Sequence, residues 1–152
     1  MELTFKHLTE IDLPLLKDLL GVFGEAFDEP HTYQSMAPSD GYLRRLLSKD
    51  TFIAIAAVAD NKVVGGLAAY VLEKFEQERS EIYIYDLAVG EGYRRQGIAT
   101  GLINLLREMA VRYNAWVIYV QADPPDEPAV KLYESLGTRE DVYHFDIVPV
   151  GQ

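Results

Sequence analysis

The segment from Tyr93 to Thr100 constrains the fold of this chain more than any other feature. It follows an apolar, strand-like run at 82–89 and precedes a run with apolar residues at helical spacing, at 102–109. A strand that leads through a short glycine-bearing turn into a helix leaves the first N–H groups of that helix without partners, and the helix dipole favours anions there. The segment therefore predicts a strand–turn–helix unit that can hold a pyrophosphate.

The residue types within this segment fit a phosphate site. Gly97 and Ala99 are small enough to let the backbone come close to a ligand, and Arg94 and Arg95 place positive charge there in an otherwise acidic protein. The alternative is an ordinary glycine-containing helix entrance that binds nothing.

The pattern Arg94-x-x-Gly97-x-Ala99 resembles the acyl-coenzyme A signature of the GCN5-related N-acetyltransferases, Gln/Arg-x-x-Gly-x-Gly/Ala. Downstream, the segment from Ala129 to Gly137 is similar to that family's Ala-x-x-Leu-Tyr-x-x-Leu-Gly element. The resemblance implies an N-acetyltransferase that uses acetyl-CoA. It also implies an α/β fold, in which a mixed central sheet is flanked by helices and splayed between its fourth and fifth strands.

Length and composition favour a single domain over 1–152, because 152 residues with 49% hydrophobic content suffice for one core. No apolar stretch approaches membrane-spanning length and the amino terminus does not resemble a signal peptide, so we expect a cytoplasmic protein without a membrane partner. The lack of cysteine excludes disulfides and a cysteine nucleophile. We also predict no metal site, because the histidines lack metal-ligand spacing: His7, His31 and His144.

The formal net charge of -10, from 24 acidic and 14 basic residues, argues against nucleic acid as a partner. A cationic partner fits such a surface better. The alternative is that the acidic surface only keeps the protein soluble.

The hydrophobic pattern predicts mixed α/β elements around one sheet. We expect strands at 3–6, 51–58, 63–71, 81–89, 116–121 and 143–148, with helices after Thr9, after Ser39, and around 102–109 and Tyr133. The polar segment 24–41 is our candidate for a substrate-covering loop. Simple alternation in the strand 81–89 puts Glu81, Tyr83, Tyr85 and Leu87 on one face, and Ile82, Ile84, Asp86 and Ala88 on the other.

The resemblance assigns cofactor contacts to two segments. The main chain of Leu87, Ala88 and Val89 would pair with the pantetheine arm, and an N–H near Leu87 would polarise the thioester carbonyl. The helix entrance would hold the pyrophosphate, through Arg94, Arg95, Gln96, Gly97, Ile98, Ala99 and Thr100.

Two residues are predicted to move protons. Tyr133 occupies the position where the family often has a tyrosine that protonates the departing thiolate, and Asp86 lies where it could take the proton of the acceptor amine. Glu81 is the second candidate base, through water, although alternation places it on the opposite face unless a bulge changes the phase. The alternatives are a structural helical tyrosine and a strand-end aspartate paired with an arginine.

Between about Tyr42 and Asp146 the chain looks like the aminoglycoside 3-N-acetyltransferases of the gentamicin-modifying branch, on the segments 80–89, 95–100, 117–123 and 144–147. This narrower resemblance implies transfer to the 3-amino group of an aminoglycoside, resistance to gentamicin-type antibiotics, and a possible homodimer. Carboxylates would meet the ammonium groups and aromatic faces the sugars. The candidate contacts are Glu81, Tyr83, Asp123, Asp126 and Asp146.

Other functions remain open from the residues alone. Each candidate carboxylate is by itself an ordinary surface acid. The acceptor could be another polyamine or a protein amine, and the fold could also bind an acyl-CoA without catalysis.

Overall fold

The computed structural model describes residues 2–29 and 37–151, and the chain divides into two compact units, Met1–Gln121 and Ala122–Gln152. Residues 30–36 of the predicted substrate-covering loop, with His31 among them, lie outside the described residues. The two units are described in turn.

The first unit is built on one five-stranded sheet in the order β1-β2-β3-β4-β5. Neighbouring strands are antiparallel except for the last pair, in which β5 runs parallel to β4. The predicted hairpin is confirmed, because Asp60 and Asn61 both have positive φ values, 49° and 65°, as a tight two-residue turn between twisted strands requires. The strands are β1 (Leu3–His7), β2 (Phe52–Ala59), β3 (Lys62–Glu73), β4 (Ser80–Val89) and β5 (Ala115–Val120).

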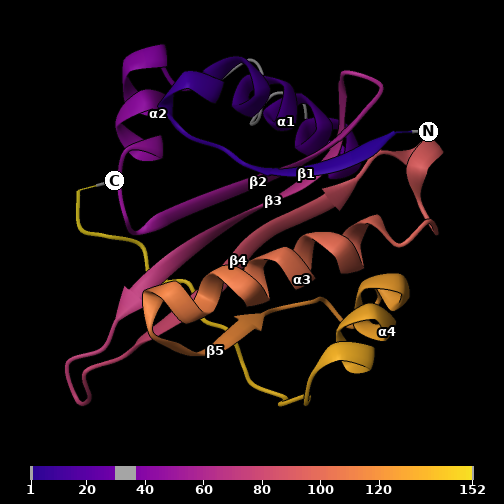
Figure 1. The fold of residues 1–152 in the computed structure, drawn as a ribbon. Helices are drawn as coiled ribbons and strands as arrows, with labels where there is room; N and C mark the ends of the chain where they lie inside the picture. The colour runs from indigo at the N-terminus through magenta and orange to yellow at the C-terminus, as the bar shows by residue number, and fades with distance from the viewer. Residues whose placement is uncertain (1, 30–36, 152) are drawn as a thin grey trace. The chain divides into compact units, whose positions relative to one another are not determined.

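Helices cover both faces of this sheet, with α1 (Leu13–Ala26) and α2 (Asp40–Leu47) on one face and α3 (Ile98–Ala110) on the other (Figure 1). Beneath α1 and α2 the sheet presents small side chains, so the helices approach closely and bury their leucines and a phenylalanine against alanines. The alanines that define this α1/α2 face are Ala54, Ala56, Ala68 and Ala88. The predicted start of α2 is confirmed, because the Ser39 hydroxyl accepts a hydrogen bond from the Tyr42 N–H at 3.2 Å.

The chain enters α1 through a short 3-10 turn, η1 (Glu10–Asp12), that buries a carboxylate. Asp12 is only 6% exposed, and it accepts hydrogen bonds from the Thr9 N–H at 2.8 Å and pairs with Lys6 at 2.8 Å. Burial alone would raise the pKa of Asp12, but the bonds from Lys6 and Thr9 outweigh it and hold the pKa below its usual value. Asp12 therefore stays ionised and fixes the start of the helix.

The sheet is splayed between β4 and β5, as predicted. Their pairing runs from Ser80 opposite Ala115 to Ile84 opposite Val120, whereas β4 continues to Val89. The sequence after β5 contains Pro124 and Pro125, which have no N–H to donate and cannot extend a sheet ladder. Among the described residues, β4 beyond the bulge pairs only with β3, from Asp86 to Val89.

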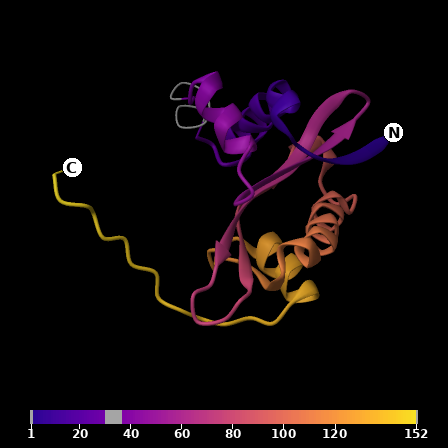
Figure 2. The ribbon, with the colours of Figure 1, turned by 60° about the vertical axis from the view of Figure 1, so that its left-hand side comes forward.

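The second unit holds one helix, α4 (Glu127–Leu136), followed by an extended segment (Figure 2). The strand predicted at 143–148 is wrong, because residues 138–149 form no strand and their apolar side chains are exposed, Tyr143 by 90% and Phe145 by 81%. Alternating apolar residues make a strand only when a second strand supplies hydrogen bonds, and the described residues provide none for this segment.

Candidate functional site

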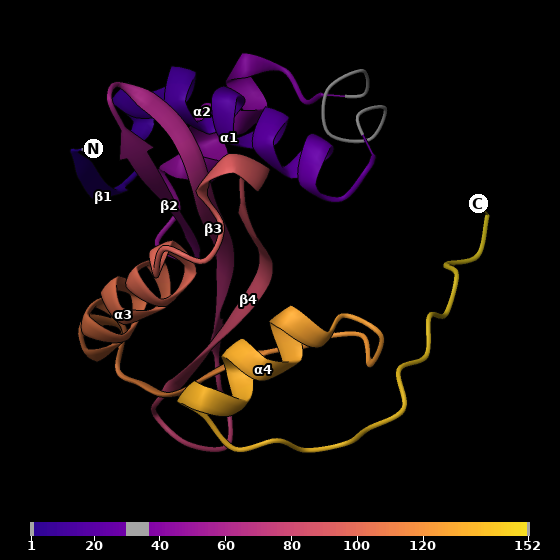
Figure 3. The ribbon, with the colours of Figure 1, turned by 90° about the vertical axis from the view of Figure 1, so that its right-hand side faces the viewer.

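The predicted helix entrance is present as a strand, a turn and a helix. β4 ends at Val89, a 3-10 turn η3 (Glu91–Tyr93) follows, and α3 begins at Ile98 (Figure 3). Gly97 is the N-cap of α3 with a φ of 79°, a left-handed conformation that glycine adopts without strain. A Cβ added to Gly97 would meet nothing within 4 Å, so the space in front of the helix is open.

Around this entrance the polar side chains are exposed. Arg94, Arg95 and Gln96 lie at the surface, and Ala99 is half-buried. Because the first N–H groups of a helix have no intrahelical partner, backbone donors and two guanidinium groups meet at one end of α3. These residues fit a diphosphate.

Three of the predicted cofactor residues are restricted by the fold. The Ile98 side chain is buried in the core and cannot contact a ligand. The Arg94 Nε donates to the Val89 carbonyl at 3.2 Å, which ties the arginine to the end of β4 and takes up one lone pair of that carbonyl. Ala88 is buried as well.

A β-bulge in β4 changes which side chains share a face. Ala68 lies opposite Asp86, whereas the next residue, Ala69, lies opposite Ile84, so Tyr85 is the extra residue. The simple alternation we predicted is therefore wrong beyond Ile84, because the bulge shifts the phase of the strand by one residue.

The bulge brings both candidate bases to the α1/α2 face. Glu81, Tyr83 and Asp86 each lie opposite a β3 residue. Each of these β3 partners is two residues from the next along the strand, so the three β4 side chains point to the same face. The partners are Leu72, Tyr70 and Ala68. Leu87, predicted beside Glu81, lies opposite the buried Leu67 and belongs to the other face.

The charge of Asp86 acts on the tyrosines around it. Burial raises the pKa of Tyr70, and the carboxylate of Asp86 contributes further. Burial also raises the pKa of Tyr83, with smaller contributions from Tyr85, Tyr119 and Asp86. Asp86 is half-buried and lies in the part of β4 that is paired with β3 but not with β5. It is therefore well placed to receive a proton from an amine at the fork.

The Glu81 carboxylate makes structural contacts. Its Oε2 accepts a hydrogen bond from the Trp116 indole at 3.0 Å, and its Oε1 lies 4.0 Å from the Lys74 ammonium. The Arg79 guanidinium packs over the Trp116 ring at 4.2 Å. The Lys74 ammonium and the Trp116 N–H thus satisfy the Glu81 carboxylate.

In the second unit, Tyr133 is half-buried on α4, where burial and the nearby Asp126 raise the pKa of its phenol. Asp126 has a structural role, because its Oδ1 accepts a hydrogen bond from the Ala129 N–H at 3.3 Å and caps α4. Asp146 is exposed and bonds to His144 at 2.8 Å, and Asp123 is exposed. The catalytic role of Tyr133 and the substrate contacts of these aspartates stay predictions.

Three tyrosines near Asp86 and Glu81 were not among the predicted site residues: Tyr70, Tyr85 and Tyr119. The sequence does carry a signal, since aromatic residues recur in the strands at 62–73, 80–89 and 115–120. The pairing register that aligns them is a tertiary property, so the signal alone did not place them together.

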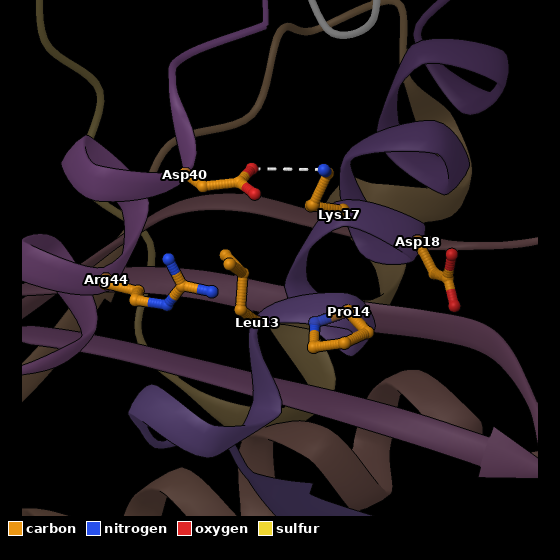
Figure 4. Close-up of a pocket in the computed structure, with 6 residues that line it drawn as sticks. All are labelled: Leu13, Pro14, Lys17, Asp18, Asp40 and Arg44. Carbon is orange, nitrogen blue, oxygen red and sulfur yellow. Dashed lines mark hydrogen bonds and ion pairs between the residues drawn. The ribbon is translucent and has the colours of Figure 1, made fainter.

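An open hollow of about 340 Å³ lies elsewhere, between α1 and α2 (Figure 4). A salt bridge of 3.0 Å between Lys17 and Asp40 crosses it, and both side chains are about half exposed. The hollow contains none of the predicted site residues, and we assign it no role. Among the described residues, no group of three or more potential metal ligands is found, and no helix has the length and apolar content needed to cross a membrane.

Comparison with known proteins decides the family. Residues 16–138 match the model of the acetyltransferase (GNAT) family. The chain belongs to the GNAT family. Members of this family are N-acetyltransferases that use acetyl-CoA as the acyl donor, so the predicted family, fold and donor are confirmed.

Several solved structures are similar to this GNAT protein over almost its whole length. An aminoglycoside acetyltransferase from an uncultured soil metagenomic sample is 54% identical, with a TM-score of 0.96 over 99% of this chain and 100% of that chain. A second one, also from an uncultured soil metagenomic sample and in complex with sisomicin, is 34% identical, with a TM-score of 0.89 over 97% of this chain and 96% of that chain. AAC(6')-Iy in complex with CoA is 14% identical and shares the fold, with a TM-score of 0.78 over 98% of this chain and 95% of that chain.

Curated relatives match over a shorter stretch. The N-alpha-acetyltransferase of Saccharolobus solfataricus is 35% identical over 95 residues, which is 55% of this chain and 54% of the relative. The GNAT protein thus spans about half the length of the curated relatives it matches. The family model crosses both compact units, and a single acetyltransferase domain stays our prediction.

Proposed function

We propose that this protein is an acetyl-CoA-dependent aminoglycoside N-acetyltransferase that acts on the 3-amino group. The observation that carries the proposal is its likeness, over nearly its whole length, to two aminoglycoside acetyltransferases, of which one was solved with sisomicin. The acidic net charge of -10 supports a polycationic acceptor. The choice of the 3-amino group rests on the resemblance in the segments at 80–89, 95–100, 117–123 and 144–147.

The donor side is formed by the entrance of α3 and the part of β4 that is not paired with β5. The N–H groups from Ile98 onward, with Arg94 and Arg95, hold the diphosphate. The main chain from Leu87 to Val89 pairs with the pantetheine arm as an added strand would. This arrangement delivers the thioester to the fork between β4 and β5.

The transfer is direct, because the chain has no cysteine to carry the acetyl group. Asp86 accepts a proton from the ammonium form of the acceptor, and the free amine attacks the thioester carbon. A C–N bond forms, the C–S bond breaks, and the leaving thiolate receives a proton from the Tyr133 phenol. The proton that the new amide nitrogen loses passes through solvent to the phenolate and restores the phenol. A phenol whose pKa is raised by burial and by Asp126 keeps its proton at neutral pH until the thiolate forms.

The acceptor is bound by carboxylates that meet its separate ammonium groups. The candidate contacts are the Glu81 carboxylate and the aromatic face of Tyr83 on β4 and, in the second unit, Asp123, Asp126 and Asp146. In its host we expect a cytoplasmic enzyme that confers resistance to gentamicin-type antibiotics, and the resemblance implies a homodimer.

Turnover tests this proposal. Purified protein is mixed with acetyl-CoA and each of four acceptors, sisomicin, gentamicin, spermidine and a short peptide with a free amino terminus, and thiol release is followed. We expect saturable turnover with the two antibiotics, and NMR of the product should place the acetyl group on the 3-amino nitrogen. Acetylation of a 6'-amine would correct the position, and turnover of none of the 3-amino antibiotics would refute the function.

A second candidate is acetylation of a peptide amino terminus, favoured by the 35% identity over 95 residues to an N-alpha-acetyltransferase. The peptide arm of the same assay tests it directly. A protein that only binds acyl-CoA would show a higher unfolding temperature with acetyl-CoA but release no thiol with any acceptor.

A further inference from the structure

Aromatic residues form a continuous row across the sheet. Phe52 on β2 lies directly opposite Tyr70 on β3, Tyr70 lies opposite Tyr83 on β4, and Tyr83 lies opposite Tyr119 on β5. Each strand from β2 to β5 thus contributes one ring at the same level of the sheet. Because directly paired residues point to the same side, all four rings lie on the α1/α2 face.

Tyr85, the extra residue of the bulge, adds a fifth ring. Its ring meets that of Tyr70 edge-on at 6.0 Å and that of Tyr83 at 5.5 Å, so it joins the two. Tyr83 in turn stacks on Tyr119, with ring centroids 4.6 Å apart and an angle of 6° between the planes. The bulge therefore turns a ladder of paired residues into a connected aromatic surface, which we call the tyrosine row: Phe52, Tyr70, Tyr83, Tyr85 and Tyr119.

The rings of the row differ in how far they are buried. Phe52 is buried in the core under α1 and α2, while Tyr70 is 39% exposed and Tyr85 is 64% exposed. Large aromatic rings usually contribute to stability by burial, and a ring as exposed as Tyr85 contributes little in this way. A connected aromatic surface that faces solvent beside carboxylates is typical of a binding site.

Two carboxylates flank the row. The charge of Asp86 acts on Tyr70 and Tyr83, and the charge of Glu81 acts on Tyr119. Their partners on β3 are four residues apart, which corresponds to about 14 Å along the strand. Two cationic groups on different rings of one elongated ligand can therefore meet separate carboxylates while the ligand lies along the aromatic rings.

We propose that Tyr70, Tyr85 and Tyr119 form a stacking surface for the sugar rings of the acceptor and select for multi-ring amino sugars. This inference rests on the proposed function and names the surface that recognises its substrate. The C–H faces of a sugar ring pack on the aromatic faces, and an ammonium group over a ring gains a cation–π attraction. Asp86 meets the amine that reacts, and Tyr85 holds the adjoining ring.

Tyr83 has a second task within the row, besides its proposed part in binding the acceptor. Its hydroxyl donates to the Gln121 side-chain oxygen at 2.9 Å, and its ring is stacked on Tyr119 across the last part of the β4–β5 pairing. This stack holds the two strands together just before they part. Tyr83 therefore positions the fork, and Tyr85 makes the contact that selects the acceptor.

Steady-state kinetics of Tyr85→Ala and Tyr85→Phe test the inference, with sisomicin and with the single-ring amine 2-deoxystreptamine as acceptors. Tyr85→Ala should raise the KM for sisomicin about tenfold, leave the KM for acetyl-CoA within twofold, and change the KM for 2-deoxystreptamine by less than threefold. Tyr85→Phe should behave like the wild type, because stacking uses the ring and not the hydroxyl. Phe75→Ala is the matched control, since Phe75 is a fully exposed aromatic residue outside the row.

Tyr70→Leu is a second variant, with an expected rise of about threefold in the KM for sisomicin. Thermal unfolding of each variant separates loss of binding from loss of structure. If Tyr85→Ala leaves the KM for sisomicin unchanged, or raises both acceptor KM values equally, the stacking surface is refuted while the proposed function stands. If the wild type acetylates no aminoglycoside, the proposed function itself is refuted and the inference falls with it.

Discussion

The entrance of α3 and the tyrosine row are built in opposite ways. The entrance comes from contiguous residues, Arg94 to Thr100, and its chemistry follows from local geometry at a helix N-terminus. The row takes its five rings from four strands, with two of them from β4, and the strands are separated by long stretches of chain. A donor site of this kind is visible in a short motif, whereas an acceptor surface of this kind exists only once the strands have paired.

Asp86→Asn should have the largest effect and tests whether the acceptor side holds the base. Asparagine cannot take the proton, so kcat should fall about a thousandfold while the KM for acetyl-CoA stays unchanged. Activity should recover in part as pH rises, because more of the acceptor is then present as free amine. Rates are measured by thiol release between neutral and alkaline pH.

The matched control for this carboxylate is Glu81→Gln, on the same face of β4. Its effect should be much smaller, because Trp116 and Lys74 already satisfy Glu81. A larger loss for Glu81→Gln than for Asp86→Asn would transfer the role of base to Glu81.

Tyr133→Phe should lower kcat about a hundredfold, since the thiolate then leaves without a proton from the phenol. The KM for both substrates should change little, because the ring remains. Tyr143→Phe removes the hydroxyl of an exposed tyrosine in the same unit and should have no effect. Equal rates for wild type and Tyr133→Phe would show that water or another donor protonates the thiolate.

Gly97→Val should affect the donor side alone. The φ of 79° at Gly97 is strained for a β-branched residue, and the reshaped entrance should raise the KM for acetyl-CoA about tenfold. The KM for sisomicin should stay within twofold. Gly92→Ala is the control, because an added Cβ there also meets nothing within 4 Å and Gly92 has no positive φ. If Gly97→Val changed only the KM for sisomicin, the donor and acceptor sites would not be separate as proposed.

Asp12→Asn lies in neither region and should change stability without changing either KM. Because the folded-state pKa of Asp12 is lowered, its contribution is present above the unfolded pKa of about 3.9 and is lost as pH falls through the folded pKa. The variant should be less stable by about 1–2 kcal/mol at pH 7, a modest figure since Lys6 is half exposed.

Urea unfolding at several pH values measures this difference. The stabilities of wild type and Asp12→Asn should converge in acid, whereas the exposed control Asp18→Asn should match the wild type throughout. A difference that persists unchanged at the acid end would rule out the ionised carboxylate as its source.

Much of the fold was predictable because its signals are local. The Asp60–Asn61 turn specifies a hairpin, Ser39 caps a helix, and Gly97 marks the entrance to α3. The strand predicted at 143–148 failed for the complementary reason. Its alternating pattern is a property of the segment, but a strand needs a partner, and the described residues offer none to this segment.

The candidate site was predicted in part. Asp86 was selected from its place at the end of a strand, and the structure puts it at the fork between β4 and β5. The sequence did not predict that Asp86 and Glu81 lie on the same face of the sheet. The extra residue Tyr85 moves each later side chain of β4 to the opposite face, and no sequence signal marks this bulge.

Residues that are neighbours along the chain were enough to identify the family, the elements up to α4 and the turn proposed to bind the donor. The tertiary structure decided which carboxylates and tyrosines stand together on the acceptor side. Strand register and a bulge set that arrangement, and both are fixed by packing of the whole sheet and not by any single segment.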